Sequence, residues 1–393
     1  MRTYYSMIPM NFKNATFGLI SILFITNSLS AQVDSRVITT AVPFALISAD
    51  PRSAALGDMG AATSADVYSQ QWNPAKYAFA TRKQAVAVTY TPYLNDIVND
   101  IFLGNLVYYN RINERSAFAA SLRFFSLGDV ELRETAEQTP LIENPNELTL
   151  DASYSLRLSE RFAMGVAARY LRSDLRIQSV STDASAGNSF AVDISGYYQS
   201  EEIAYRKFNG RWRGGFNISN LGPKMGFDAN VNDNFLPTNL RLGGGFDFIL
   251  NDMVSKVSVT TEINKLLVPT PPVRDANGEI IDGQDDDVGF VSGVFQSFGD
   301  APGGFSEELK EITWALSAEY WYLDAFAFRT GFFYEDNSKG ARQFLSLGTG
   351  FKMNAINFDA SYLFSTARVQ SPLEGTLRFG ITINIGNQTY DEY

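Results

Sequence analysis

From residue 85 onward, the sequence divides into segments of about ten residues in which apolar and polar side chains alternate. A period of two is typical of a β-strand with one apolar face, whereas a helix repeats its apolar face every 3.6 residues. The clearest case is the segment 148–158. One of its faces carries Leu148, Leu150, Ala152, Tyr154, Leu156 and Leu158, and the other carries Thr149, Asp151, Ser153, Ser155 and Arg157.

This pattern predicts fourteen strands, an even number, as single-chain bacterial outer-membrane barrels require. Their length matches the roughly 9 to 11 residues that a tilted strand needs to cross a membrane, whereas soluble strands are usually near 5 to 6 residues. The predicted strands are 85–92, 101–110, 116–126, 148–158, 161–173, 189–200, 211–220, 238–248, 255–265, 312–322, 325–334, 342–352, 355–365 and 375–385.

The face opposite the apolar one separates a membrane barrel from the alternative, a soluble β-sandwich. A dry sandwich core cannot accept charged side chains, but the lumen of a barrel can. We interpret these charges as a luminal network that neutralises itself rather than as a catalytic site. They are Asp151, Arg157, Arg169, Arg241, Asp247, Glu262, Glu319, Arg329, Asp359 and Arg378. The expected fold class is therefore all-β, a 14-stranded antiparallel transmembrane β-barrel.

The connections and the aromatic residues indicate how this barrel would lie in the membrane. Tight turns at 159–160, 323–324 and 353–354 alternate with long connections, the latter at 127–147, 174–188, 221–237 and 266–311. Short turns are periplasmic and long loops extracellular in such barrels, so we expect both termini in the periplasm. The aromatic residues near strand ends are expected in interfacial girdles. They include Tyr108, Tyr109, Tyr197, Tyr198, Trp321 and Tyr322.

The first 31 residues have the features of a secretory signal peptide. Arg2 and Lys13 precede an apolar stretch from Phe17 to Leu29, and small residues follow it. Cleavage is expected after Ala31 or one residue earlier. We assign 32–80 to a plug, 81–386 to the barrel and 387–393 to a periplasmic tail, because 32–80 lacks the alternation and a barrel this wide is not filled by its own side chains.

Composition limits the chemistry. The chain has no histidine and no cysteine, so zinc, haem, thiol and Ser-His-Asp sites built on these residues are excluded, and we expect no enzyme activity, cofactor or metal. The net charge of −11 argues against nucleic acid as a partner. The segment 275–279 resembles part of a calcium loop but lacks the remaining ligand positions, so we favour a solvent-exposed surface there.

Three motifs carry a family resemblance: Asn73-Pro74-Ala75, the segment 220–224 and the segment 236–243. With the signal peptide and the strand count, they make the chain resemble the FadL-like outer-membrane family and, within it, the PorV proteins of the type IX secretion system, over nearly the whole mature chain. The resemblance implies a SprA-type translocon barrel, the C-terminal domains of exported proteins, the cell-surface attachment complex and outer-membrane lipid as partners. The alternative is a FadL-type transporter of hydrophobic small molecules. Asn73, Pro74 and Ala75 themselves are better explained as a turn that stabilises the plug than as ligand contacts.

The long connection 266–311 suggests where a partner binds. Its first half, 269–287, is polar and acidic, but its second half is too aromatic to lie bare in water. This half either covers the barrel mouth, dips into the membrane interface or binds a partner. Our hypothesis is that 290–305 and 223–237 form a partner-binding face. Its candidate residues are Phe235, Leu236, Phe290, Phe295, Phe298 and Phe305.

Overall fold

The computed structural model describes residues 36–94, 100–133, 138–175, 185–227, 233–251, 255–367 and 375–390. All of them belong to one compact unit. The predicted signal peptide lies outside the described residues. None of the helices in the described ranges is long and apolar enough to cross a membrane.

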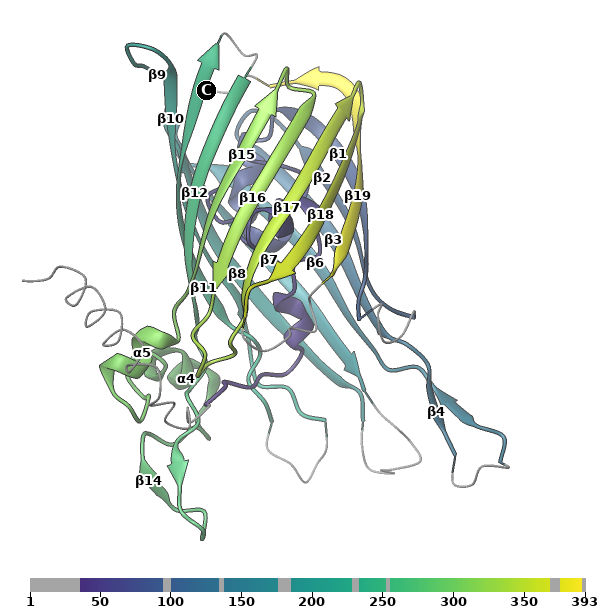
Figure 1. Cartoon of the computed structure of the whole chain (residues 1–393), viewed down its shortest axis with the longest axis vertical. Coiled ribbons are helices and arrows are strands. Elements are labelled where there is room, and N and C mark those ends of the chain that lie inside the picture. Colours follow the sequence, from purple (N-terminus) through teal and green to yellow (C-terminus); the bar gives the residue numbers. More distant parts are fainter. Residues whose placement is uncertain are drawn as a thin grey trace, which may run out of the picture. The chain divides into compact units, whose positions relative to one another are not determined.

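Fourteen long antiparallel strands of 9 to 13 residues form the body of the described unit (Figure 1). Each overlaps one strand predicted from the alternation, so the fold class is confirmed. The strands are β1 (Arg82–Pro92), β2 (Ile101–Arg111), β3 (Ser116–Leu127), β6 (Asn146–Arg157), β7 (Phe162–Asp174), β8 (Gly187–Gln199), β10 (Asn209–Leu221), β11 (Asn239–Asn251), β12 (Ser255–Leu266), β15 (Thr313–Tyr322), β16 (Phe326–Tyr334), β17 (Gln343–Met353), β18 (Ile356–Ser365) and β19 (Leu377–Thr389).

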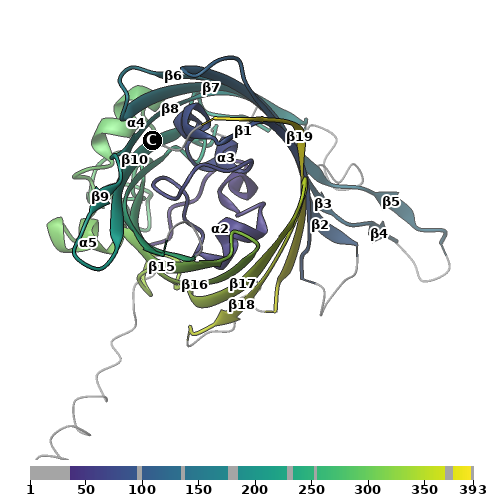
Figure 2. The same cartoon turned by 90° about the horizontal axis from the view of Figure 1, so that it is seen from above.

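The sheet closes on itself, which leaves the long strands without a free edge (Figure 2). β1 pairs with β19, with Ala85 opposite Asn384, and β10 pairs with β11, with Gly214 opposite Gly244. Every strand therefore has its backbone hydrogen bonds satisfied, as lipid surroundings require. In β6, Thr149 and Asp151 are buried inside, whereas the apolar face points outward.

The two ends of the barrel differ as predicted. One end has tight turns, such as that between β15 and β16, where Leu323 and Asp324 both have positive φ (55° and 48°) in the manner of a type I′ hairpin. The other end has the long connections. β19 ends at the short-turn end, as expected, but Arg36 lies at the long-loop end, where its backbone N–H donates to the carbonyl of Ser338. The described chain therefore enters the lumen from the long-loop end, and the start of the mature chain, which is expected in the periplasm, lies outside the described residues.

Two tyrosines assigned to the girdle are inside the barrel instead. Tyr109 and Tyr197 are buried, Tyr109 stacked on Tyr77 with ring centroids 5.0 Å apart. Adjacent residues of a strand point to opposite faces, so two neighbouring tyrosines cannot both face lipid. Their neighbour Tyr198 is exposed on the outer face, where the girdle prediction places it.

The segment before β1 runs through the lumen and carries four short helices. They are η1 (Pro43–Leu46), α2 (Pro51–Ala55), α3 (Ser69–Trp72) and η2 (Pro74–Phe79). α2 has a clear sequence origin: Pro51 occupies its first turn, and the Asp50 side chain caps it by accepting the Ser53 N–H at 2.7 Å. We call residues 36–81 the plug, and Figure 2 shows it inside the ring of strands.

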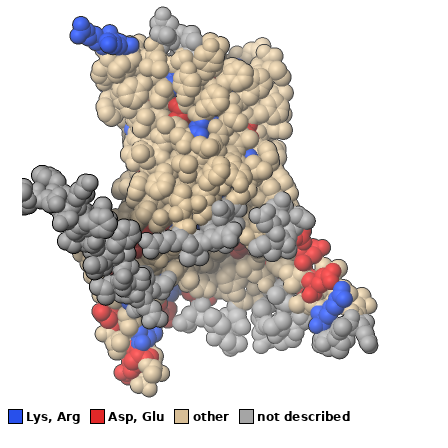
Figure 3. All heavy atoms as spheres, in the orientation of Figure 1, with Lys and Arg blue, Asp and Glu red and all other residues tan. Residues whose placement is uncertain are grey.

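Short strands and helices lie at the two ends of the barrel. β9 (Ile203–Ala204) extends the turn before β10 at the short-turn end. The long-loop end carries the hairpins β4–β5 (Val130–Leu132, Leu141–Glu143) and β13–β14 (Val273–Arg274, Ile280–Asp282), and the helices α4 (Phe290–Gln296) and α5 (Phe305–Lys310). On the face drawn in Figure 3, the barrel wall shows few charged side chains, acidic and basic side chains lie together on the long loops, and one basic patch lies at the opposite rim.

Candidate functional site: a filled lumen and an exposed aromatic surface

The plug lies directly against glycines of the barrel wall. A β-carbon at Gly165 of β7 would lie 2.7 Å from the Ala75 amide nitrogen, and one at Gly380 of β19 would lie 2.9 Å from the Pro51 ring. Both distances are too short for real carbon atoms, so the plug backbone occupies space that any larger residue would need. Four further inward glycines meet the plug equally closely. They are Gly215, Gly243, Gly331 and Gly348.

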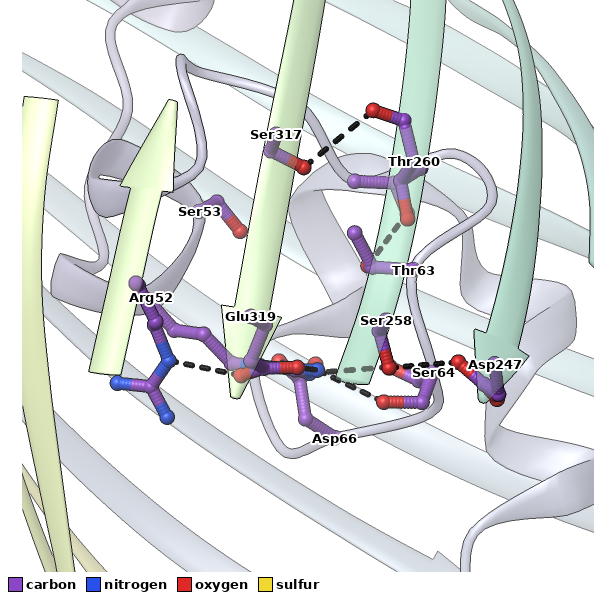
Figure 4. Close-up of polar contacts among 12 residues, drawn as sticks. Arg52, Ser53, Thr63, Ser64, Asp66, Asp247, Ser258, Thr260, Ser317 and Glu319 are labelled. Atoms are coloured by element: carbon purple, nitrogen blue, oxygen red, sulfur yellow. Dashed lines mark hydrogen bonds and ion pairs between the residues drawn. The ribbon is translucent and has the colours of Figure 1, made fainter. Parts of the chain in front are cut away.

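A buried ionic network ties the plug to the wall on the β15–β18 side (Figure 4). Arg52 of α2 donates to Glu319 of β15 at 3.0 and 2.8 Å and to Asp66 of the plug at 2.6 Å. Arg329 of β16 donates to Glu319 at 2.7 Å and to Asp359 of β18 at 2.7 Å. Each of the three carboxylates is thus paired with at least one of the two guanidinium groups, in surroundings where an unpaired charge would be costly.

Other luminal carboxylates bind plug backbone or wall cations. Glu262 of β12 accepts the N–H groups of Gly60 and Ala61 at 2.9 and 2.7 Å. Across the lumen, Arg169 pairs with Asp151 and Asp193. The charges predicted for the inner face therefore lie inside the barrel, where some bind the plug, as Glu262 does, and others, such as Arg169 and Asp151, pair within the wall.

The Asn-Pro-Ala motif holds two parts of the plug and the wall together. The Asn73 side-chain amide donates to the carbonyls of Ala61 at 2.8 Å and of Gly196 in β8 at 2.9 Å. Its carbonyl oxygen accepts the Ala75 N–H at 3.1 Å and caps η2. All hydrogen-bonding groups of this amide are thus used within the protein.

At the long-loop end, an ionic clasp fixes α5 to the barrel rim. Glu307 accepts two hydrogen bonds from Arg36, each at 2.9 Å, and one from Lys339 at 2.7 Å. Glu311 accepts from Lys339 at 2.8 Å and from Lys265 of β12 at 2.7 Å. The clasp consists of Arg36, Lys265, Lys339, Glu307, Glu308 and Glu311. It joins the start of the plug to two long loops.

The clasp shifts the pKa values of its carboxyl groups. Burial alone would raise the pKa of Glu307, but the hydrogen bonds from Arg36 and Lys339 outweigh it and lower the pKa to about 2. The pKa of Glu311 is lowered as well, because hydrogen bonds from Lys265 and Lys339 overcome its burial. Asp300, close to the acidic Glu308, has its pKa raised to about 6, chiefly by burial.

The opposite side of these helices is apolar and is not covered by any other described part of the chain. Phe295 and Phe305 expose 75% and 78% of their surface, and Phe298, Val291 and Leu309 are each more than half exposed. We call these five residues the aromatic surface. Figure 2 draws α4 and α5 outside the ring of strands. The glutamates of α5 face the barrel while its apolar residues face outward, the reverse of what a helix covering a hydrophobic core would show.

The structure separates the six candidate partner residues. Phe295, Phe298 and Phe305 lie in the aromatic surface, and Phe290 is half-buried. Phe235 is also half-buried and packs where Gly293 of α4 leaves space, so the two predicted loops do meet. Leu236 is buried with plug residues such as Phe44, which excludes direct contact with a partner in this conformation.

Sequence reasoning did not find the clasp. Its signal is present, since Glu307, Glu308 and Glu311 are spaced to share one face of a helix. The cations that bind them lie far away in the sequence, at 36, 265 and 339, and only the closed barrel brings them together.

The closed barrel, with the plug packed against the inside of its wall, defines an integral outer-membrane β-barrel protein. Residues 30–273 match the family described as "Type IX secretion system protein PorV", and the chain belongs to that family. It is an outer-membrane component of the type IX secretion system. A search of curated proteins found no significant match.

Solved structures with a similar arrangement include FadL-type channels. The toluene transporter TodX of Pseudomonas putida shares 11% identity at a TM-score of 0.48, covering 87% of this chain and 100% of its own. The toluene transporter TbuX of Ralstonia pickettii shares 13% identity at a TM-score of 0.44, and the match covers 86% of this chain and 97% of the TbuX chain. A FadL homologue of Pseudomonas aeruginosa shares 11% identity at a TM-score of 0.43, and the match covers 90% of this chain and 100% of the homologue's chain.

Proposed function

We propose that this chain is a cargo adaptor of the secretion system. It binds the SprA-type translocon barrel and the C-terminal domains of exported proteins, and it carries the cargo to the cell-surface attachment complex. The observation that carries the proposal is the aromatic surface, because soluble and membrane proteins rarely leave several large apolar side chains together in water. In this proposal the plugged barrel anchors the protein rigidly in the membrane, and its lumen is not a transport passage.

The clasp supports this role because it fixes α5, which carries Phe305 and Leu309 of the aromatic surface, before a partner arrives. A surface that is already ordered loses less conformational entropy on binding than a mobile loop. Aromatic side chains at the centre of an interface usually supply most of its binding energy. Phe295, Phe298 and Phe305 are therefore the residues through which we expect the partner to bind.

The alternative, transport of hydrophobic small molecules, demands a passage through the lumen. Such a passage would require the plug to move away from six wall glycines and to break the buried pair between Arg52 and Glu319. Removing one partner from a buried ion pair typically costs about 3 to 5 kcal/mol. An adaptor needs no such motion, which favours the secretion role.

The test is affinity purification of the tagged full-length protein from its native outer membrane in mild detergent. The variant F295S/F305S removes the two most exposed rings. The control L141S/I142S removes two apolar side chains that are about half exposed (48% and 52%) from the β4–β5 hairpin of another long loop. Unheated mobility in an SDS gel reports whether each barrel is folded.

We expect wild type and control to retain a very large barrel protein and exported proteins. The F295S/F305S variant should retain at least about tenfold less of both, because hot-spot aromatic residues contribute 2 kcal/mol or more each. Retention that is unchanged in this variant would refute the role of the aromatic surface. Purification of the barrel with a bound apolar small molecule and without protein partners would refute the adaptor function itself.

A further inference from the structure

The short-turn end of the barrel has a charge opposite to that of the whole chain. The sequence carries a net charge of −11, yet the strand ends and turns at 81–83, 111–116 and 157–161 contain six cations and two carboxylates. The cations are Arg82, Lys83, Arg111, Arg115, Arg157 and Arg161. These segments belong to neighbouring strands, since β1, β2, β3, β6 and β7 are consecutive in the sheet.

An open cavity of about 820 Å³ lies within this basic rim. This volume is in the range of small-molecule sites. Its polar part is lined by Lys83, Arg115 and Glu114, together with Gln388 and Tyr390 from the end of β19. Two cations and one carboxylate leave one excess positive charge in the cavity.

The other part of the cavity belongs to the lipid-facing surface. Tyr154 lies on the outward face of β6 and is 49% exposed, Ile112 is 53% exposed, and Leu156 continues the same outward row. The cavity therefore joins a basic region at the end of the barrel to apolar side chains on the outer face of its wall. A soluble anion matches only the first of these regions.

The two cations are available to a ligand. Lys83 donates to the Gln388 side chain at 2.9 Å, and Arg115 donates to the carbonyl of Arg157 at 3.2 Å. Among the residues that the structure describes, neither has a carboxylate partner within ion-pair distance. Arg115 is exposed and lines the cavity.

We propose that this cavity binds an anionic phospholipid of the periplasmic leaflet. Lys83 and Arg115 hold the headgroup phosphate, and Ile112, Tyr154 and Leu156 contact the acyl chains. Basic residues near a membrane surface attract anionic lipid by about 1 kcal/mol each. The bound lipid would fix the depth and tilt of the barrel on the β1–β6 side. This inference does not depend on the adaptor function.

The experiment is native mass spectrometry of the full-length protein in detergent, with added phosphatidylglycerol, phosphatidylcholine or inorganic phosphate. K83Q/R115Q removes both cations of the cavity. The matched control R206Q/K207Q removes two exposed cations at the same end of the barrel but outside the cavity. We expect wild type and control to bind phosphatidylglycerol at least about tenfold more tightly than phosphatidylcholine, and K83Q/R115Q to lose this preference.

Each other outcome overturns the proposal. Equal losses in both double variants would show a diffuse basic rim instead of a site. Full competition by inorganic phosphate would show a site for free anions. An acidic periplasmic protein that is retained through Lys83 and Arg115, without a lipid preference, would show a protein-binding surface.

Discussion

A single methyl group can test whether the plug is packed against the wall as the structure shows. Gly165 of β7 faces inward, and its substitution by alanine would place a carbon 2.7 Å from the Ala75 amide nitrogen and 3.0 Å from the Ala75 Cα. To reach an ordinary contact of 3.4 Å, the plug backbone must retreat by about 0.7 Å. That retreat stretches the hydrogen bond from Ala75 to Ser195, which is already 3.2 Å long.

The matched control is Gly244→Ala in β11. A β-carbon there meets no atom within 4 Å, so only the strand preference for alanine over glycine remains. Overpacking a well-packed interior costs about 1 to 3 kcal/mol. We expect G165A to lower the free energy of unfolding by that amount, and G244A to leave it unchanged or raise it by about 0.5 to 1 kcal/mol.

The assay is urea unfolding of both variants and wild type in lipid vesicles, followed by tryptophan fluorescence. Trypsin cleavage after Lys76, which is 1% exposed, gives a second readout that is specific to the plug. Cleavage should increase in G165A alone. If G165A is as stable as G244A and its plug remains resistant to trypsin, the plug does not press on the wall and the reasoning is wrong.

Two further predictions concern the ionic groups. E319Q should lower the free energy of unfolding by about 3 to 5 kcal/mol, because it deprives buried Arg52 and Arg329 of a shared partner. The control D286N, which breaks an exposed pair, should change it by less than about 1 kcal/mol. Equal effects of the two variants in urea titrations would contradict this prediction. In the clasp, the lowered pKa of Glu307 stabilises the folded loop above the ordinary pKa of a glutamate, and this stability is lost as the pH falls toward the folded-state pKa of about 2. The raised pKa of Asp300 has the opposite effect, because its protonation below a pH of about 6 favours the folded loop. Hydrogen exchange of 290–310, corrected for pH, should therefore be slowest near pH 5, and protection that falls between pH 7 and 5 would contradict the assignment.

The strands could be predicted from the sequence because each one repeats the same alternation of apolar and polar residues. In β6, alternate residues face lipid and lumen, so the order of apolar and polar residues determines both the strand and its orientation. Where neighbouring residues were both assigned to one environment, as with Tyr108 and Tyr109, the prediction was wrong for the buried one. Strict alternation of the two faces of the strand places Tyr109 inside the barrel when Tyr108 faces outward.

The plug and the clasp could not be predicted in the same way. Arg52 and Glu319 are far apart in the sequence, and nothing local to either residue indicates the other. Likewise, the inward glycines of the wall have no signature in the alternation, because glycine is neither apolar nor polar in that pattern. Closure of the barrel creates these contacts, so they follow from the topology and not from the order of residues along any one segment.

The plug also links the two ends of the molecule. It begins at Arg36 in the clasp that holds α5, and near its other end the carbonyl of Ala80 accepts a hydrogen bond from Arg111 at the basic rim. Between these points it is fixed by buried pairs such as Arg52 with Glu319. A partner that displaced α5 would have to break contacts of Arg36, and thus pull on the plug itself. The plug therefore stiffens the rim that carries α5, which is part of the surface through which we propose that the partner binds.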